Sequence, residues 1–359
     1  MAQPHDWCGG APAASAGPEG HLSLGQIGDD FARCDARLAH RAASLGMTRR
    51  EFLASLAASA AGMLALADAR GSAAAQGLPA KSRVVVVTHP EVVVKEYRVN
   101  PPVVRRMLDR ALVELTGLQT EGQAWASIGR EDDFVAVKHN SIGAPTLHSH
   151  TEINDVLASA LAEEAKVDPK RILAVDRQLP PPYADLSEPF TLPSSRLQTH
   201  LRRLYTDQAT AIINVSILKA HFGEGISAAM KNHLGSVNNP AAFHGWEPDR
   251  MPKSLPELNA LAPIRQKTRL VIVDAIRPLY AAGPADQPDY RWDFRGLIVA
   301  TDPVAATAVG MRILEKQRAA VRGKPWPMTA ARQMVAWGQA IGLGNAEADR
   351  IDLVQADMA

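Results

Sequence analysis

The stretch ATAIINVSILKAHFGEGISAAMKNHLG, residues 209–235, decides the fold of this chain. Its apolar run, residues 211–215, is rich in β-branched side chains, which is typical of a strand buried within a parallel sheet. A polar turn with Gly223 and Gly225 follows, and a helix is expected to begin at Ser227. In α/β proteins a strand, a glycine-containing turn and a helix often bind anions, because the first helical N–H groups have no partner inside the helix. The sequence therefore predicts an α/β protein with a polar site after this strand.

Strand and helix patterns alternate along the rest of the chain. Ser149 and Glu152 form a capping-box pattern at one helix start, whereas residues 238–256, with four prolines and Gly245, are expected to be irregular. Strands are expected at residues 82–88, 134–137, 171–175, 270–273, 297–300 and 351–354, and helices at 101–116, 152–165, 196–205, 303–317 and 329–340. This order predicts a mostly parallel sheet with helices on both faces, three layers in all, within a single domain over residues 76–359 and a core at about 84–354.

The composition excludes several classes of protein. With 46% hydrophobic and 21% charged residues and a formal net charge of +1, the chain shows no footprint for nucleic acid or for an anionic membrane. The two cysteines, Cys8 and Cys34, both precede the export signal described next. We therefore expect a mature chain without disulfides, without a cysteine nucleophile and without an iron–sulfur cluster held by its own cysteines.

The segment that begins at Met47 resembles a twin-arginine export signal. Arg49 and Arg50 stand in an S/T-R-R-x-F-L pattern, and an uncharged stretch of 16 residues follows at 52–67. That stretch is shorter than the ~20 residues needed to span a bilayer. Small-x-small sites at 67–69 and 73–75 close the segment, and cleavage after Ala75 is favoured. We expect the twin-arginine translocase as a partner, a periplasmic or otherwise exported mature protein, and no stable membrane span after cleavage. An amphipathic or buried N-terminal helix is the alternative.

Signals of this kind usually begin a few residues before the paired arginines. Met47 is therefore the expected start, and residues 1–46 are expected to be a mis-called or disordered extension. This route carries folded proteins, often with a cofactor already bound, which makes a cofactor more plausible without identifying one.

Polar residues stand at the ends of the predicted strands: Lys138 and Asn140, Asp176, Lys219 and His221, Asp274, and Asp302. In sheets of this kind ligands bind outside the carboxyl ends of the strands. We therefore expect several of these side chains to line one cleft, although strands commonly end in polar residues for no functional reason.

The lysines and asparagines are the candidate substrate-binding residues. Lys138, Lys219 and Lys231 can hold a phosphate or a carboxylate, because an ammonium group is a compact point charge for such anions. Asn140 and Asn232 can add neutral donors. The alternative is that these are surface lysines and turn asparagines.

The histidines and aspartates are the candidates for acid–base chemistry and for a divalent metal. His221, close to Lys219, is the candidate for moving a proton, together with Asp274. The H-x-H pair of His148 and His150, with His244 and Asp302, is a candidate set of metal ligands, and a divalent ion there would polarise an oxygen or activate water. Exposed loop histidines are the favoured alternative for that pair, and an N-cap before Pro303 is the favoured alternative for Asp302. The chain contains no P-loop, dinucleotide fingerprint or G-x-S-x-G motif.

Several motifs, taken together, resemble the signature of domain-of-unknown-function family 362. The motifs are VKHN (137–140), INVSILKAH (213–221), MKNHLGSV (230–237), the later His244, IVDAI (272–276), GP (283–284) and TDPVAA (301–306), and they extend the resemblance over about residues 84–354. The usual forms are roughly V-K-P-N, I-N-V-P-K-L-K-T-H, K-N-x-x-G, V-D-A and S-D-P-V-A-x-D. The resemblance implies an α/β domain with a polar central site and leaves the activity unassigned. Some members of the family look as though they carry ferredoxin-like clusters, which a cysteine-free domain cannot hold.

The chain departs from the family pattern at three places. His139 stands where proline is usual, Ser216-Ile217 replaces Pro-Lys, and Thr307 replaces the second aspartate of the last motif. If that aspartate binds a metal or moves a proton in the family, this chain has lost that function or moved it to another residue.

Two functions follow as hypotheses. The first is an exported enzyme that acts on a small anionic substrate, with Lys219 and Lys231 holding the anion, His221 moving the proton and Asp274 with a histidine binding a metal. The second is a non-catalytic periplasmic binding or cofactor-carrying protein that uses the same lysines.

Overall fold

The computed structural model describes residues 78–95, 97–221, 225–244 and 250–359. The chain divides into two units, Met1–Gly71 and Ser72–Ala359, and all of the described residues belong to the second. The predicted twin-arginine signal, its cleavage site after Ala75 and the extension at 1–46 lie outside the described residues. No helix in the part of the chain that the structure describes has the length and apolarity needed to cross a membrane.

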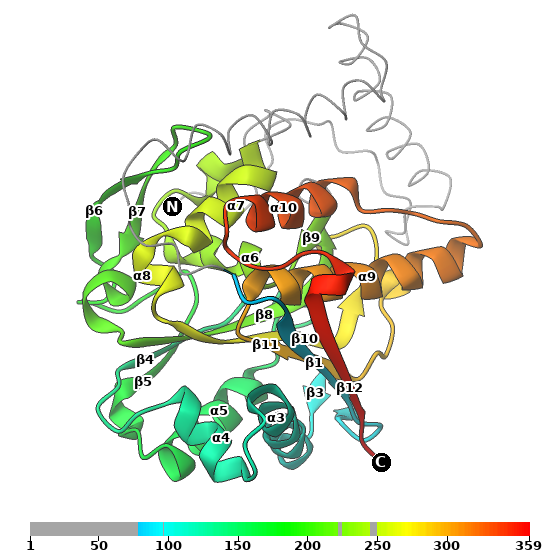
Figure 1. Ribbon diagram of the computed structural model, residues 1–359, viewed down its shortest axis with the longest axis horizontal. Helices are drawn as coiled ribbons and strands as arrows, with labels where there is room; N and C mark the ends of the chain where they lie inside the picture. Colours follow the sequence, from blue (N-terminus) through cyan, green and yellow to red (C-terminus); the bar gives the residue numbers. More distant parts are fainter. Residues whose placement is uncertain (1–77, 96, 222–224, 245–249) are drawn as a thin grey trace, which may run out of the picture. The chain divides into compact units, whose positions relative to one another are not determined.

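A single eight-stranded sheet forms the centre of the domain (Figure 1). The strand order is β12-β1-β11-β10-β8-β4-β5, with β9 paired to β8. Neighbours run parallel except that β11 is antiparallel to both β1 and β10, and β9 is antiparallel to β8. The strands are β1 (Ser82–Thr88), β4 (Val135–Lys138), β5 (Ile172–Val175), β8 (Ala211–His221), β9 (Gly225–Ser227), β10 (Thr268–Leu279), β11 (Gly296–Ala300) and β12 (Ile351–Asp357). The prediction of a mostly parallel sheet is confirmed.

Helices cover both faces of this sheet, which confirms the three-layer architecture (Figure 1). On one face lie α3 (Pro101–Thr116), α4 (Glu121–Ile128) and α5 (Thr151–Glu164), and on the other α6 (Ala229–Asn232) and α9 (Pro303–Arg322), with α7 (Arg250–Ala260), α8 (Ala262–Arg265) and α10 (Thr329–Ala340) on that same side. Alternate strand residues such as Val85, Ile213 and Ile272 pack in one apolar core with α3, α4 and α5. The helix at 101–116 begins at proline and ends at Gly117 in the left-handed conformation, as predicted.

The basic helix expected at residues 196–205 does not form. Instead, β6 (Leu186–Thr191) and β7 (Gln198–Arg202) pair in an antiparallel hairpin, and a π-helical turn (Leu204–Gln208) follows. Thr199 and Leu201 are buried while their neighbours are not, which is the period of two of a strand. A further small hairpin joins β2 (Val93–Lys95) and β3 (Arg98–Val99). The expected irregular segment 238–256 is also partly helical, because α7 begins at Arg250 and has Pro252 in its first turn, where no N–H donor is needed.

The strand–turn–helix site predicted after the central strand does not form either. Strand β8 is eleven residues long and carries Lys219 and His221 itself. After residues 222–224, which lie outside the described residues, the chain pairs back along β8 as β9, where a helix was expected to start. Helix α6 has only four residues and no side-chain cap, so it offers no helix terminus for an anion. The capping box at α5 is also absent, because Ser149 Oγ bonds the backbone of Asn140 and His150 occupies the N-cap position.

Candidate functional site

The direction of each strand decides which candidate residues share an edge of the sheet. The carboxyl ends of β4, β5, β8 and β10 lie together because these strands are parallel, and Lys138 and Lys219 lie at that edge. Strand β11 runs the other way, so Asp302, two residues after its end, lies at the opposite edge. The prediction that Asp302 shares a cleft with the other strand ends is therefore wrong. We call the carboxyl edge of β4, β5, β8 and β10 the rim.

Asp302 has a structural role at the opposite edge. Its carboxylate accepts hydrogen bonds from the N–H groups of Val304 (2.8 Å) and Ala305 (3.0 Å), as an N-cap of α9. It also accepts from Ser82 Oγ at 2.6 Å and from Asn345 N at 2.7 Å. A cavity of about 460 Å³ lies beside it, but none of the rim residues lines that cavity. Asp302 cannot complete a metal site with His148 and His150.

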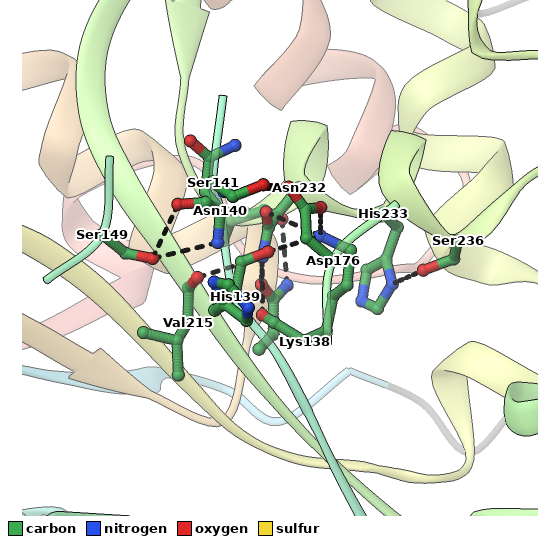
Figure 2. Close-up of polar contacts among 12 residues, drawn as sticks. Lys138, His139, Asn140, Ser141, Ser149, Asp176, Val215, Asn232, His233 and Ser236 are labelled. Carbon is green, nitrogen blue, oxygen red and sulfur yellow. Dashed lines mark hydrogen bonds and ion pairs between the residues drawn. The ribbon is translucent and has the colours of Figure 1, made fainter. Parts of the chain in front are cut away.

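On the face of the sheet that α6 covers, a buried ion pair occupies the rim (Figure 2). Lys138 Nζ lies 2.6 Å from Asp176 Oδ1, 2.6 Å from the His139 carbonyl and 3.2 Å from Asn232 Oδ1. The Lys138 side chain is 0% exposed and that of Asp176 is 6% exposed. Burial lowers the pKa of Lys138, against the attraction of Asp176. Burial would raise the pKa of Asp176, but Lys138 and the Ser141 donors together hold it below its usual value.

The amide of Asn232 completes this group of residues. Its Nδ2 donates to the Lys138 carbonyl at 2.8 Å and to Asn214 Oδ1 at 2.7 Å, so both ends of the side chain are engaged. Lys138 and Asn232 therefore hold β4, β5, β8 and α6 together and have no donor directed to a ligand. The expectation that these two residues bind substrate is not supported.

A close approach of the backbone explains the glycine of the MKNHLG motif. A Cβ at Gly235 would lie 2.5 Å from Asp176 Oδ1 and 2.7 Å from Lys138 Nζ, closer than real Cβ atoms approach other atoms. Nearby, His233 is fully buried with Nδ1 3.2 Å from Ser236 Oγ (Figure 2). Burial lowers the pKa of His233 to about 3, so this imidazole is neutral at physiological pH.

The segment 139–150, which we call the rim loop, is held down by side chains from separate strands. Asp176 Oδ2 accepts hydrogen bonds from Ser141 N (2.9 Å) and Ser141 Oγ (2.6 Å). Lys219 Nζ donates to the carbonyls of Ile142 (2.9 Å) and Leu147 (3.4 Å). The polar side chains at the strand ends thus form hydrogen bonds with backbone groups of the rim loop, in addition to any that they form with a ligand.

Asn140, at the start of the rim loop, is only partly engaged. Its backbone N–H donates to Ser149 Oγ at 2.9 Å. Its Oδ1 is buried and has no hydrogen-bond partner among the described residues. The side-chain amide therefore keeps one acceptor for a water or a ligand.

At the other end of the rim loop, His150 and Asp274 form a buried pair. Asp274 Oδ2 accepts from the His150 N–H (2.8 Å) and from His150 Nδ1 (2.7 Å), and Asp274 Oδ1 accepts from Ile276 N (3.1 Å). Although burial opposes it, Asp274 raises the pKa of His150 above its ordinary value. Burial would raise the pKa of Asp274, but the charge and the hydrogen bonds of His150 lower it below its ordinary value. The carboxylate makes Nδ1 the donor, and Nε2 has no hydrogen bond to any described residue.

Lys219 is the second buried lysine of the described chain, and its surroundings differ from those of Lys138. It is 2% exposed, its ammonium bonds only the two rim-loop carbonyls, and no ion pair within the described residues includes it. Burial and, after it, the charge of Lys231 lower its pKa to about 8, although Asp176 and Asp286 partly oppose this shift. Lys219 is therefore a cation that is removed from water and that has no carboxylate next to it among the residues the structure describes.

Arg291 contacts the rim loop, which Lys219 and the His150–Asp274 pair also contact. Its Nη1 donates to the Thr146 carbonyl of the rim loop at 2.8 Å and lies 3.4 Å from Asp286 Oδ2, and its guanidinium stacks 5.0 Å above the ring of Tyr97. The charge of Arg291 acts on the pKa of His150, and Asp274 acts on that of Arg291. Arg291 thus lies within electrostatic range of the His150–Asp274 pair, and Asp286 lies within electrostatic range of both Arg291 and Lys219.

The remaining histidine candidates fall into two places. His221 is buried on β8 with its ring centroid 6.1 Å from that of His244, and Lys231 Nζ lies 3.4 Å from His244 Nε2. The ring centroid of His148 is 6.3 Å from that of His150, but both His148 nitrogens bond backbone carbonyls of the rim loop. Within the described ranges no three or more His, Cys, Asp or Glu side chains are grouped so that they could hold a metal. The predicted metal set of His148, His150, His244 and Asp302 is therefore not assembled.

Sequence reasoning missed three features of this site. It assigned His150 to a metal, whereas His150 is the partner of Asp274, and it gave no role to Arg291 or to Asp286. Strand alternation could have suggested that Asp274 faces the start of α5, since Leu270, Ile272 and Ile276 share that face. No local signal points to Arg291, which reaches the site from a loop after β10.

The fold and the rim together define an α/β protein with a polar edge built around a buried acid–base pair and a buried lysine. Residues 187–312, from β6 into α9, match the family model of DUF362, described as a domain of unknown function. This match supports the resemblance drawn from the motifs, over the part that contains Lys219, Lys231 and Asp274. A search of curated proteins finds no match.

Among solved structures, a protein from Thermotoga maritima matches at 10% sequence identity and a TM-score of 0.33. The match covers 65% of this chain and spans 61% of that protein. A likeness at this level carries no argument about function.

Proposed function

We propose that this protein is an exported enzyme that acts on a small anionic substrate at the rim. The observation that carries the proposal is the buried ammonium of Lys219, which has no carboxylate partner in the described chain and which bonds the same rim loop that ends at the His150–Asp274 pair. A buried charge without a counter-charge is costly, and a bound anion would compensate it. The polar strand ends of α/β sheets are also where ligands bind in such proteins.

The anion is held by Lys219 and Lys231, whose charges act on each other. Binding an anion between them removes their mutual repulsion, so the two lysines gain from the ligand together. Lys138 and Asn232 take no part, because their donors are used within the protein.

The proton is moved by His150. Asp274 fixes the ring with Nδ1 as donor and leaves Nε2 to exchange a proton with the substrate, the arrangement of a general acid–base with an orienting carboxylate. Asp274 is thus a positioning residue, since it is 1% exposed and its two oxygens accept hydrogen bonds from His150 and Ile276. His150 replaces His221 as the residue for proton transfer, because it is His150 that the aspartate orients.

Binding can be tested with Lys219→Met, with Lys170→Met at an exposed site as the matched control. Calorimetry with inorganic phosphate and with small carboxylates should show about 10- to 100-fold weaker binding for Lys219→Met, as expected for the loss of a charge-assisted hydrogen bond. Lys170→Met should bind as the unchanged protein does. Equal affinity of all three proteins would remove the proposal.

Catalysis is separated from binding by His150→Gln. This variant should bind the anion but lose turnover, followed as depletion of compounds from a metabolite extract by mass spectrometry. A ligand that is held tightly by the unchanged protein, with no turnover in either protein, would favour the non-catalytic binding protein.

Export is tested by replacing Arg49 and Arg50 with lysines in the full chain. The unchanged protein should reach the periplasm with an N-terminus at residue 76, and the variant should remain unprocessed in the cytoplasm. Export of both proteins to the same extent would contradict this part of the proposal.

A further inference from the structure

We infer that Lys219 is a nucleophile that forms an imine with the carbonyl group of a small oxo acid. This inference rests on the proposed function, since it names the substrate class and the reactive atom of the same site. It accounts for the difference that, within the described ranges, Lys138 is ion-paired and Lys219 is not.

The comparison of the two buried lysines carries the argument. Both come from neighbouring parallel strands and end at the same rim, and both are almost completely removed from water. Lys138 has the carboxylate of Asp176 at 2.6 Å, whereas the ammonium of Lys219 meets only two neutral carbonyls. Among the described residues, a carboxylate thus lies at the ammonium of Lys138, whereas none lies in hydrogen-bonding distance of the ammonium of Lys219.

This arrangement favours the neutral amine of Lys219. Removal from water and the charge of Lys231 both disfavour the ammonium, and its pKa falls to about 8. At pH 7 about a tenth of such a lysine is the neutral amine, far more than for a lysine in water. A lysine that is desolvated or next to another cation is the usual nucleophile toward carbonyl groups.

Lys219 lies just below the surface, under the rim loop. The hydrogen bond to the Ile142 carbonyl is only partly buried, and Ile142 itself is 48% exposed. The inference requires residues 142–147 to shift, so that both carbonyl acceptors leave Nζ and a substrate takes their place. The carbonyl oxygens of the loop thus occupy positions that substrate oxygens take.

The step balances without any oxidant or other co-reactant. The neutral amine attacks the substrate carbonyl carbon, a C–N bond forms, and the π electron pair moves to the oxygen, which takes a proton. Loss of water then breaks the C–O bond, so one ammonium and one carbonyl give one protonated imine and one water. His150 Nε2 is the group that takes the ammonium proton and returns it to the leaving oxygen, while Lys231 holds the carboxylate of the oxo acid.

The experiment traps the imine with sodium cyanoborohydride in the purified full-length mature protein, with pyruvate and acetoacetate as probes. Reduction with pyruvate should add to Lys219 the mass of pyruvic acid less one oxygen atom, located by peptide mass spectrometry. Lys219→Arg, which keeps the charge but cannot form an imine, should remain unlabelled, and Lys170→Met should be labelled as fully as the unchanged protein. Circular dichroism and thermal unfolding of Lys219→Arg show whether that variant is folded.

Calorimetry with pyruvate and with propionate, which lacks the carbonyl, separates this inference from the proposed function. If both acids bind in a manner that depends on Lys219 but neither oxo acid is trapped, the anion site stands and the imine is refuted. If label appears equally at other lysines, or persists in Lys219→Arg, the inference is also refuted. If the label is confined to Lys219 but calorimetry shows no binding of propionate, Lys219 is the nucleophile and the proposed anion site is refuted.

Discussion

Replacing Asp176 by asparagine tests whether Lys138 stabilises the fold or is a ligand-binding residue. The substitution keeps the shape of the side chain and removes the charge that faces an ammonium 2.6 Å away and 0% exposed. Removal of one partner of a buried ion pair costs about 3–5 kcal/mol, because the other charge stays buried without compensation. Lys138 retains the His139 carbonyl and Asn232 Oδ1 as acceptors, so we expect a loss of about 3 kcal/mol, at the lower end of that range.

The assay is urea unfolding of the mature chain, with stability taken from the midpoint at an unchanged slope. Asp352→Asn is the matched control, because the Arg83–Asp352 pair has nearly the same length, 2.7 Å, but its side chains are 45% and 42% exposed. An exposed pair contributes less than about 1 kcal/mol, so the control should lose little.

The pH dependence gives a second measurement on the same variant. The folded-state pKa of Asp176 lies below its unfolded value, so its contribution to stability is present above the unfolded pKa and is lost as the pH falls through the folded pKa. The difference between the unchanged protein and Asp176→Asn should therefore shrink in acid. If Asp176→Asn costs no more than Asp352→Asn at neutral pH, Lys138 is not a buried structural cation, and our reasoning about the rim is refuted.

Three further predictions concern other parts of the rim and its opposite edge. Gly235→Ala places a Cβ 2.5 Å from a carboxylate oxygen and should lower the free energy of unfolding, measured in urea, by about 1–3 kcal/mol. The control is Gly122→Ala in α4, which faces a flexible side chain and should be neutral or stabilising. Equal effects of the two substitutions would contradict the close approach at Gly235. Asp274→Asn should lower the pKa of His150, which NMR of the ring protons can follow, and an unchanged titration would show that the aspartate does not act on the ring. Because the folded-state pKa of His150 is raised, the contribution of the His150–Asp274 pair to stability is fully present below the unfolded pKa of about 6.5 and is lost as the pH rises through the folded value. Asp302→Ala should cost about 0.5–2 kcal/mol through loss of the N-cap of α9 and leave anion binding by calorimetry unchanged, so that weakened binding would place this residue in the site after all.

Local sequence determined most of the secondary structure. The apolar runs at β1, β4 and β10 are strands because a strand buried on both faces needs apolar side chains on both. Helix α3 begins at Pro101 and ends at Gly117, where the missing N–H and the left-handed conformation fit those residues. These features depend on a few neighbouring residues, so the alternation of strands and helices, and with it the fold class, followed from the chain alone.

Tertiary structure alone decided how the candidate residues are grouped. The antiparallel direction of β11 moved Asp302 to the other edge, and the pairing of β9 with β8 replaced a predicted helix terminus. The partners of Lys138 and Asp274 lie 38 and 124 residues away in the chain. Strand direction and burial are settled by pairing between distant segments, which no local pattern records. The sequence determined which side chains end the strands, and only the folded sheet decided that Lys138 meets a carboxylate while Lys219, as far as the structure describes the chain, meets two backbone carbonyls.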